Sequence, residues 1–173
     1  MSLLNDFKQV KCFGFDVDGV LTDGSILLLD DGQMARIMNT KDGYALQLAI
    51  KKGYHIIIIS GGGNAGVQQR LHKLGIENVY INAENKQQVL AAYLQAKNIQ
   101  PAEVLFMGDD IPDYNAMKSI GLPCCPADAV AEVKSISKYI SGLEGGKGCV
   151  REVIEKVLKL NGHWHIETGI ASK

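Results

Sequence analysis

Four consecutive isoleucines, Ile56 to Ile59, constrain the fold of this chain most. A half-exposed strand alternates apolar and polar residues, whereas a run without alternation is typical of a strand buried on both faces of a parallel sheet. Further candidate strands are Val10 to Phe15, Ile76 to Ile81 and Val104 to Met107, and segments with helical spacing separate them. This alternation predicts an α/β fold with a doubly wound, mostly parallel, Rossmann-like sheet.

Length and composition narrow the class of protein. The chain has 173 residues, so we expect a single domain over residues 1–173. A net charge of −1 without a basic stripe argues against nucleic-acid binding. No secretory h-region and no membrane-spanning apolar run is present, so no membrane partner is expected. Four cysteines without Cys-x-x-Cys spacing predict neither disulfides nor a zinc site, which favours a soluble, cytoplasmic protein.

Polar residues that can take part in catalysis or metal binding follow the predicted strands directly. Asp16 and Asp18 come after the first strand, and their i, i+2 spacing lets both carboxylates face one reaction centre. Acids this close repel unless a cation lies between them, and Mg²⁺ prefers such oxygen ligands. Ser60 follows the isoleucine run, and Asp109 follows Val104 to Met107. Function collects at the carboxyl ends of strands in doubly wound sheets, so these residues are expected to converge.

Two further features support a phosphate site. Gly61, Gly62 and Gly63 lie between Ser60 and a predicted helix, and a hydroxyl with free backbone N–H groups at a helix start can bind phosphate. Triple glycine alone is a weak signal, because linkers contain it too. Lys86 opens the next helix, where a lone lysine is more often a solvated charge.

A β-hairpin is predicted over about residues 25–38. Two β-prone runs, Ser25 to Leu29 and Ala35 to Met38, flank an Asp-Gly turn. The hairpin is nearly all apolar and cannot bury both faces alone. It therefore packs on its own domain or forms a contact with another subunit.

Four segments stand in the order of the four motifs of the haloacid dehalogenase superfamily, which this chain resembles. The segments are Asp16-Val17-Asp18, Ser60, Lys86 and Gly108 to Asp113. The resemblance implies a phosphatase in which Asp16 is the nucleophile that forms an aspartyl-phosphate, and Asp18 is the general acid and base. A carboxylate nucleophile divides the phosphoryl transfer into two displacements.

The same resemblance implies the other roles in the site. Mg²⁺ would be the cofactor, and its ligands would be Asp16, the Asp18 carbonyl and Asp109. The implied phosphate-binding residues are Ser60, Gly61 and Lys86, with Asp110 and Asp113 orienting ligands or Lys86.

Further segments resemble the small capless branch of the superfamily, in which a homotetramer joined by the hairpins covers each site. They include Asn39-x-x-Asp42-Gly43, Arg70 to Ile76 and Gly145 to Glu152. The implied substrate is 3-deoxy-D-manno-octulosonate 8-phosphate, an eight-carbon sugar acid of lipopolysaccharide precursor synthesis. The implied substrate-binding residues are Asn39, Lys41, Asp42, Gly62, Arg70 and Lys73.

One departure leaves an alternative open. Many members of the branch have Arg at the position of Gly62, and a sister activity on nine-carbon sugar acid 9-phosphates has Glu there. The missing side chain at Gly62 favours the eight-carbon substrate over the nine-carbon one.

Two non-enzymatic alternatives fit less well. A phospho-acceptor receiver domain would have its paired acids after the first strand and its acceptor after the third, which is not the order seen here. A silent regulatory module would not need the intact set of catalytic positions. The glycine loop at 145–148, Arg151 and the tail at 161–173 are expected near the mouth of the site.

Overall fold

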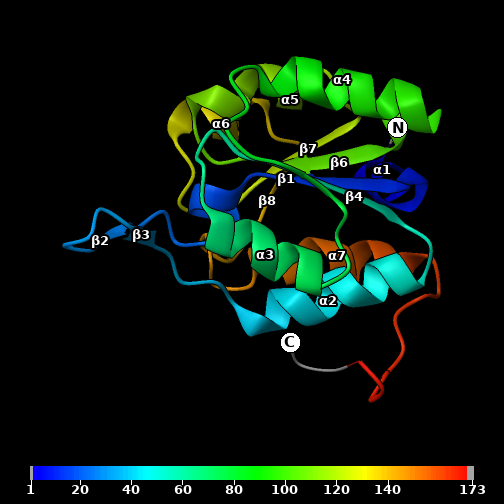
Figure 1. Ribbon diagram of the computed structural model, residues 1–173. Coiled ribbons are helices and arrows are strands. Elements are labelled where there is room, and N and C mark those ends of the chain that lie inside the picture. Colours follow the sequence, from blue (N-terminus) through cyan, green and yellow to red (C-terminus); the bar gives the residue numbers. More distant parts are fainter. Residues whose placement is uncertain (1, 171–173) are drawn as a thin grey trace.

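A six-stranded parallel sheet forms the centre of the computed structural model, which describes residues 2–170. The strand order is β5-β4-β1-β6-β7-β8 (Figure 1). The strands are β1 (Cys12–Phe15), β4 (His55–Ile59), β5 (Asn78–Tyr80), β6 (Val104–Met107), β7 (Leu122–Cys125) and β8 (Tyr139–Ile140). Every neighbouring pair is parallel, which confirms the predicted doubly wound sheet.

Helices cover both faces of the sheet (Figure 1). One face carries α1 (Leu3–Gln9), α2 (Thr40–Lys51), α3 (Ala65–Lys73) and α7 (Cys149–Leu160). The other carries α4 (Lys86–Lys97), α5 (Tyr114–Lys118) and α6 (Ala131–Ile136). Shorter helical turns span Val17–Leu21, Pro101–Glu103 and Ile111–Asp113. Between residues 2 and 170, no helix combines the length and apolarity needed to cross a bilayer.

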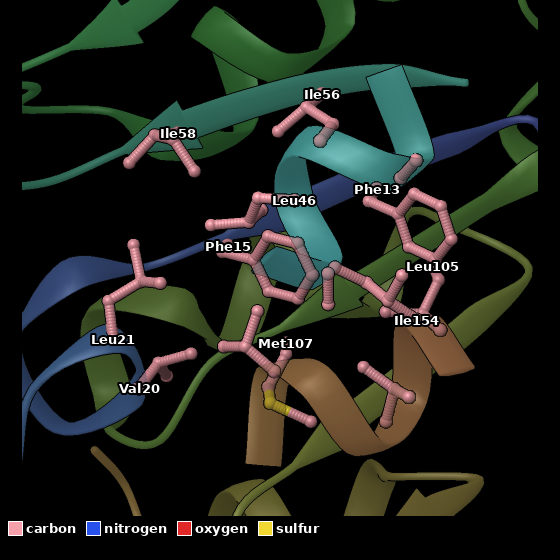
Figure 2. Close-up of a cluster of buried hydrophobic side chains, with 14 of the residues drawn as sticks. Phe13, Phe15, Val20, Leu21, Leu46, Ile56, Ile58, Leu105, Met107 and Ile154 are labelled. Atoms are coloured by element: carbon pink, nitrogen blue, oxygen red, sulfur yellow. The ribbon is translucent and has the colours of Figure 1, made fainter. Parts of the chain in front are cut away.

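Strand β4 shows why the isoleucine run lacks alternation. Ile56 and Ile58 pack with Phe13 in the core under α2 and α7 (Figure 2), whereas Ile57 and Ile59 pack in the core under α4 and α5. Burial of each such side chain contributes about 1.5–3 kcal/mol, so both faces favour apolar residues.

The hairpin stands away from the sheet (Figure 1). Its strands β2 (Leu27–Leu28) and β3 (Met34–Ala35) pair antiparallel and are shorter than predicted. Leu28 is 74% exposed and Ile37 is 80% exposed. The hairpin therefore leaves its apolar side chains without cover within one chain.

Three local features go beyond the sequence analysis. Helix α1 was not predicted from the sequence. Helix α2 begins at Thr40, because the Asn39 side chain caps it by accepting from Lys41 N. Asp128 accepts a hydrogen bond from Gly145 N at 2.9 Å and caps no helix, and α6 follows Val130 without a side-chain cap.

The tail folds back along α2 and α7. His163 Nδ1 lies 3.0 Å from the Tyr54 hydroxyl. The Arg151 guanidinium lies over the rings of Tyr44 and Trp164, so its side chain faces the tail. The sequence had predicted Arg151 near the mouth of the site. Residues 171–173 of the predicted tail lie outside the described residues.

Candidate active site

Three neighbouring strands bring the predicted site residues together. Asp16 follows β1, Ser60 follows β4 and Asp109 follows β6, and β1 pairs with both of the other strands. Gly19 closes the turn behind Asp16 with φ of +84°, and a Cβ there would lie 2.0 Å from Asp109 Oδ2. Only glycine allows this close approach between the turn and the carboxylate.

Lys86 connects two buried carboxylates. Its Nζ lies 2.8 Å from Asp16 Oδ1 and 2.7 Å from Asp113 Oδ1. The second oxygen of Asp113 accepts from Asp109 N at 3.1 Å. Asp16, Lys86 and Asp113 are at most 7% exposed, so their charges depend on one another rather than on water. We call Asp16, Lys86, Asp109 and Asp113 the charge centre.

The charge centre is short of positive charge. Burial raises the pKa of Asp16 to about 7, and the Asp113 charge adds to this while Lys86 opposes it. Burial, followed by the Asp16 charge, raises the pKa of Asp109 to about 7. Burial disfavours charged Lys86, but Asp16 and Asp113 outweigh it and raise the Lys86 pKa. A further cation would keep Asp16 and Asp109 ionised at neutral pH.

The donor atoms fit a magnesium ion. Carboxylate oxygens of Asp16, Asp109 and Asp113 lie within 4.8 Å of one another. Asp109 Oδ1 is buried without a hydrogen-bond partner, whereas both oxygens of Asp113 are engaged. Asp16 and Asp109 are therefore the side chains available to such an ion, and hard oxygen ligands suit Mg²⁺.

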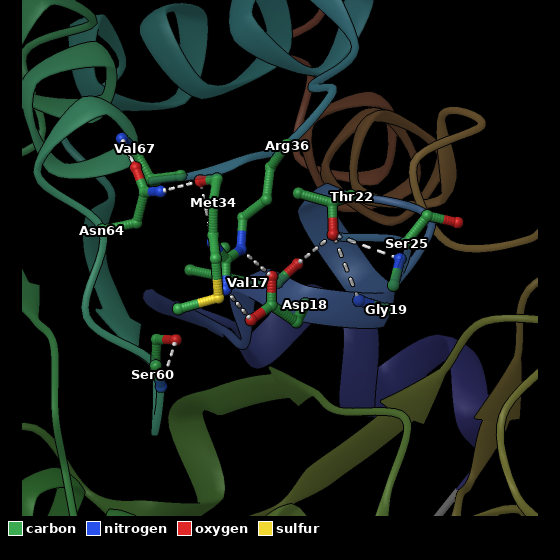
Figure 3. A network of polar contacts seen from close by, with 12 residues as sticks. Val17, Asp18, Gly19, Thr22, Ser25, Met34, Arg36, Ser60, Asn64 and Val67 are labelled. Atoms are coloured by element: carbon green, nitrogen blue, oxygen red, sulfur yellow. Dashed lines mark hydrogen bonds and ion pairs between the residues drawn. The ribbon is translucent and has the colours of Figure 1, made fainter. Parts of the chain in front are cut away.

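The Asp18 carboxylate is bound by Arg36 of the hairpin (Figure 3). Arg36 Nε and Nη2 donate to its two carboxylate oxygens at 2.5 and 3.1 Å. Thr22 Oγ1 accepts from Gly19 N at 3.3 Å and fixes the turn that carries Asp18. The Asp18 carboxylate is thus engaged by Arg36, and metal binding by the Asp18 carbonyl stays a prediction.

The phosphate-binding predictions occupy the loop after β4 and the start of α4. Ser60 is 4% exposed, and its Oγ accepts from Gly62 N at 3.2 Å. Ser60 and Gly62 line a small cavity together with Asp18. Gly61 is exposed beside them. Asp110 is exposed and caps the following turn through Ile111 N at 2.7 Å, so its predicted role in orienting ligands stays a prediction.

The substrate-binding predictions at α2 join the helix to the C-terminal part of the chain. Asn39 Nδ2 donates to Gly146 O at 3.2 Å, and Asp42 Oδ1 accepts from Arg151 N at 2.8 Å. Asp42 is 1% exposed, and burial raises its pKa to about 6. Lys41 is exposed at the helix start. Contact of these residues with substrate stays a prediction.

A groove of about 710 Å³ lies between the hairpin and α3. Arg70 of α3 lines it, whereas Lys73 is exposed and lies outside this lining, and substrate binding by either residue stays a prediction. Arg36 lines it too, and sequence reasoning missed this residue. Its only signal was a single charge within the apolar run Ala35 to Met38.

An Asp-x-Asp turn after a central parallel strand, with a buried lysine and a late acid, defines a phosphoryl-transfer site of the haloacid dehalogenase type. The profile of haloacid dehalogenase-like hydrolases matches residues 41–121, which include Ser60, Lys86 and Asp109. The 3-deoxy-D-manno-octulosonate 8-phosphate phosphatase KdsC of Escherichia coli K12 is 32% identical over 155 residues, covering 90% of this chain and 82% of that protein.

Solved structures agree. The chain superposes on the 3-deoxy-D-manno-octulosonate 8-phosphate phosphatase of Yersinia pestis with a TM-score of 0.91, at 28% identity over 93% of this chain and 87% of that one. The enzyme of Moraxella catarrhalis, in complex with magnesium, phosphate and 3-deoxy-D-manno-octulosonate, gives 0.88 at 31% identity, over 91% and 90%. The chain therefore belongs to the 3-deoxy-D-manno-octulosonate 8-phosphate phosphatase family of haloacid dehalogenase-like hydrolases.

Proposed function

We propose that this protein hydrolyses 3-deoxy-D-manno-octulosonate 8-phosphate to the free sugar acid and phosphate, with Mg²⁺ as cofactor. The observation that carries the proposal is the charge centre, in which a buried lysine holds the nucleophile candidate Asp16 at 2.8 Å beside an unpartnered Asp109 oxygen. Sequence and structural relatives with that named activity support the choice of substrate.

Asp16 attacks the phosphorus atom in the first step. A bond forms between its carboxylate oxygen and phosphorus, and the bond from phosphorus to the sugar oxygen breaks. Asp18 donates a proton to that leaving oxygen, so the sugar acid departs as a neutral alcohol. The resulting aspartyl-phosphate keeps the phosphoryl group in the site.

Water completes the reaction in the second step. Asp18, now ionised, takes a proton from water as the water oxygen attacks phosphorus. The bond to Asp16 breaks, which releases phosphate and restores the carboxylate. In this proposal Lys86 and Ser60 stabilise the phosphoryl oxygens as charge develops on them, which is supported by the contact of Lys86 with Asp16 and by Ser60 lining the cavity that contains Asp18. Bound magnesium would supply further positive charge at Asp16 and Asp109.

The proposed assembly is a homotetramer joined through the hairpins. Leu27 and Leu28 are 64% and 74% exposed, which leaves large apolar side chains of the hairpin uncovered on one chain. A neighbouring subunit would bury it and would keep water from the open groove.

A substrate panel tests the proposal. Purified protein with Mg²⁺ would be given the eight-carbon sugar acid phosphate, a nine-carbon sugar acid 9-phosphate, a neutral hexose 6-phosphate and para-nitrophenyl phosphate. The highest kcat/KM is expected with the eight-carbon acid. Preference for the nine-carbon acid would show that the proposed eight-carbon substrate is wrong. Activity unaffected by EDTA would contradict the proposed Mg²⁺ cofactor.

A further inference from the structure

One residue of the exposed hairpin turns inward. The Arg36 side chain is 5% exposed, whereas the next residue, Ile37, is 80% exposed. Its guanidinium holds both oxygens of Asp18 (Figure 3). The planar fork of arginine suits this two-point contact with a carboxylate.

The base of the hairpin is fixed at a second point. Asn64 Nδ2 donates to Met34 O at 2.6 Å, and Asn64 Oδ1 caps α3 by accepting from Val67 N at 2.9 Å (Figure 3). The hairpin base is therefore joined both to the turn that carries Asp18 and to the helix that follows the Ser60 loop. These contacts hold Arg36 in one place.

The missing side chain at Gly62 leaves room for this guanidinium. A Cβ at Gly62 would lie 3.2 Å from Asp18 Oδ2, 3.5 Å from Arg36 Nη2 and 3.7 Å from Ser60 Oγ. Any longer side chain there would start within contact distance of the guanidinium. An arginine from the hairpin thus reaches the space beside Gly62 in this chain.

Arg36 also lies at the boundary between two cavities. Arg36, Asn64 and Val67 line both the 710 Å³ groove and the small cavity that contains Asp18 and Ser60. The groove lining contains two arginines, Arg36 and Arg70, and no Asp or Glu among the residues from 2 to 170. Such a lining favours an anionic ligand.

We propose that Arg36 is a specificity-determining residue that binds the carboxylate of the sugar acid in the groove. At the same time it positions Asp18 next to the leaving oxygen. Guanidinium has five N–H donors, of which Asp18 uses two and Met34 O one at 3.4 Å, so two donors remain for a second carboxylate on the groove side. Arg36 takes this role only if the proposed substrate is right.

Two variants of Arg36 separate its roles when assayed with two substrates. Para-nitrophenyl phosphate lacks the carboxylate, and the eight-carbon sugar acid phosphate carries it. For Arg36→Gln, KM for the sugar acid phosphate should rise tenfold to a hundredfold, because a charge-assisted contact is lost. KM for para-nitrophenyl phosphate should change less than about threefold, while kcat falls with both substrates because Asp18 loses its support.

Arg36→Lys keeps the charge without the fork. It should recover most of the KM for the sugar acid phosphate while kcat remains low. Arg151→Gln is the matched control, because Arg151 is also paired with a carboxylate, Glu155 at 3.3 Å, but on α7. It should leave the ratio of the two KM values unchanged. Thermal melting of each variant reports whether it is folded, and Arg36→Lys carries the test if Arg36→Gln does not fold.

Equal rises in KM for both substrates, or no rise for either, would overturn the role of Arg36 and leave the proposed function standing. A wild-type protein that hydrolyses the neutral hexose phosphate as well as the sugar acid phosphate would overturn both. Failure of the Arg36 proposal is therefore detected in the variants, and failure of the proposed function is detected in the wild-type protein.

Discussion

The charge centre and the hairpin differ in how tightly the fold holds them. In the charge centre, Asp16 and Asp109 follow central strands, the side chains are nearly all buried, and they contact one another at 2.7–3.1 Å. The hairpin has two-residue strands, and its leucines lie in the open. Phosphoryl transfer needs fixed geometry, whereas the hairpin is an exposed arm that the contacts of Arg36 and Asn64 join to the site.

Asp16→Asn tests the charge centre most severely. An amide is a poor nucleophile and a weaker metal ligand, so kcat should fall by roughly 10⁴-fold or more. Single-turnover assays with the sugar acid phosphate check this, together with a melting curve that shows an intact fold. Activity near the wild-type rate would remove Asp16 from the mechanism.

Lys86→Met should affect stability strongly. The change leaves Asp16 and Asp113 buried without their cation, which costs about 3–5 kcal/mol of unfolding free energy near pH 8. Urea denaturation measures it. Lys159→Met is the matched control, because Lys159 is 60% exposed and pairs with Glu155 on the surface of α7, so a change within about 0.5 kcal/mol is expected. Equal losses would show that burial of Lys86 has no energetic weight.

Without magnesium, the charge centre should make stability depend on pH. Asp16 and Asp109 have a folded-state pKa of about 7, above their usual 3.8, so the folded protein binds more protons than the unfolded chain between these values. The contribution of these two acids to stability is therefore greatest near pH 4 and is lost as pH rises toward 7, and Tm should fall with it.

Added Mg²⁺ should remove most of this loss and raise Tm most above pH 7. Asp109→Asn should flatten the metal-free profile. A metal-free Tm that rose from pH 5 to pH 7 would contradict the raised pKa values.

Substitutions beside the groove should change substrate choice more than rate. Gly62→Glu places a carboxylate next to Arg36 and should shift preference toward the nine-carbon acid by about tenfold. Arg70→Ala should raise KM about tenfold with little change in kcat, because Arg70 lines the groove and lies outside the charge centre. Steady-state kinetics with both acids measure these effects. A loss confined to kcat in Arg70→Ala would exclude it from substrate binding.

Leu28→Asp should have the smallest effect on the subunit itself. Leu28 is 74% exposed, so the fold should lose less than about 0.5 kcal/mol, whereas the proposed tetramer should dissociate. Light scattering at assay concentration distinguishes the two states. An active wild-type monomer would disprove the proposed hairpin contact.

The sequence predicted those parts of the site that local pattern determines. Short apolar runs identified the strands, and residues directly after them had to meet at one edge because parallel strands end together. Asp16, Ser60 and Asp109 were therefore placed together before their distances were known. The contact of Asp113 with Lys86 joins residues 27 positions apart, and its 2.7 Å geometry required the structure.

The contacts of the hairpin could not be predicted in the same way. Arg36 reaches Asp18 because of how the chain turns between residues 18 and 36, and no periodicity encodes that turn. Asn39 and Asp128 show a related limit. Both are residue types that often cap helices, yet Asn39 caps α2 whereas Asp128 binds the distant loop at Gly145. The backbone N–H groups that tertiary structure brings near each side chain decide which contact forms.

Neighbours along β4 are not neighbours in the core. Ile57 and Ile58 point into separate helical layers. A cavity created by truncating Ile57 is therefore lined by different helices from a cavity created by truncating Ile58. Energetic effects of substitutions at adjacent positions should add independently, while those two positions apart, such as Ile56 and Ile58, should couple. The two helical layers are thus free to change their packing separately over evolutionary time, with the catalytic edge of the sheet held constant between them.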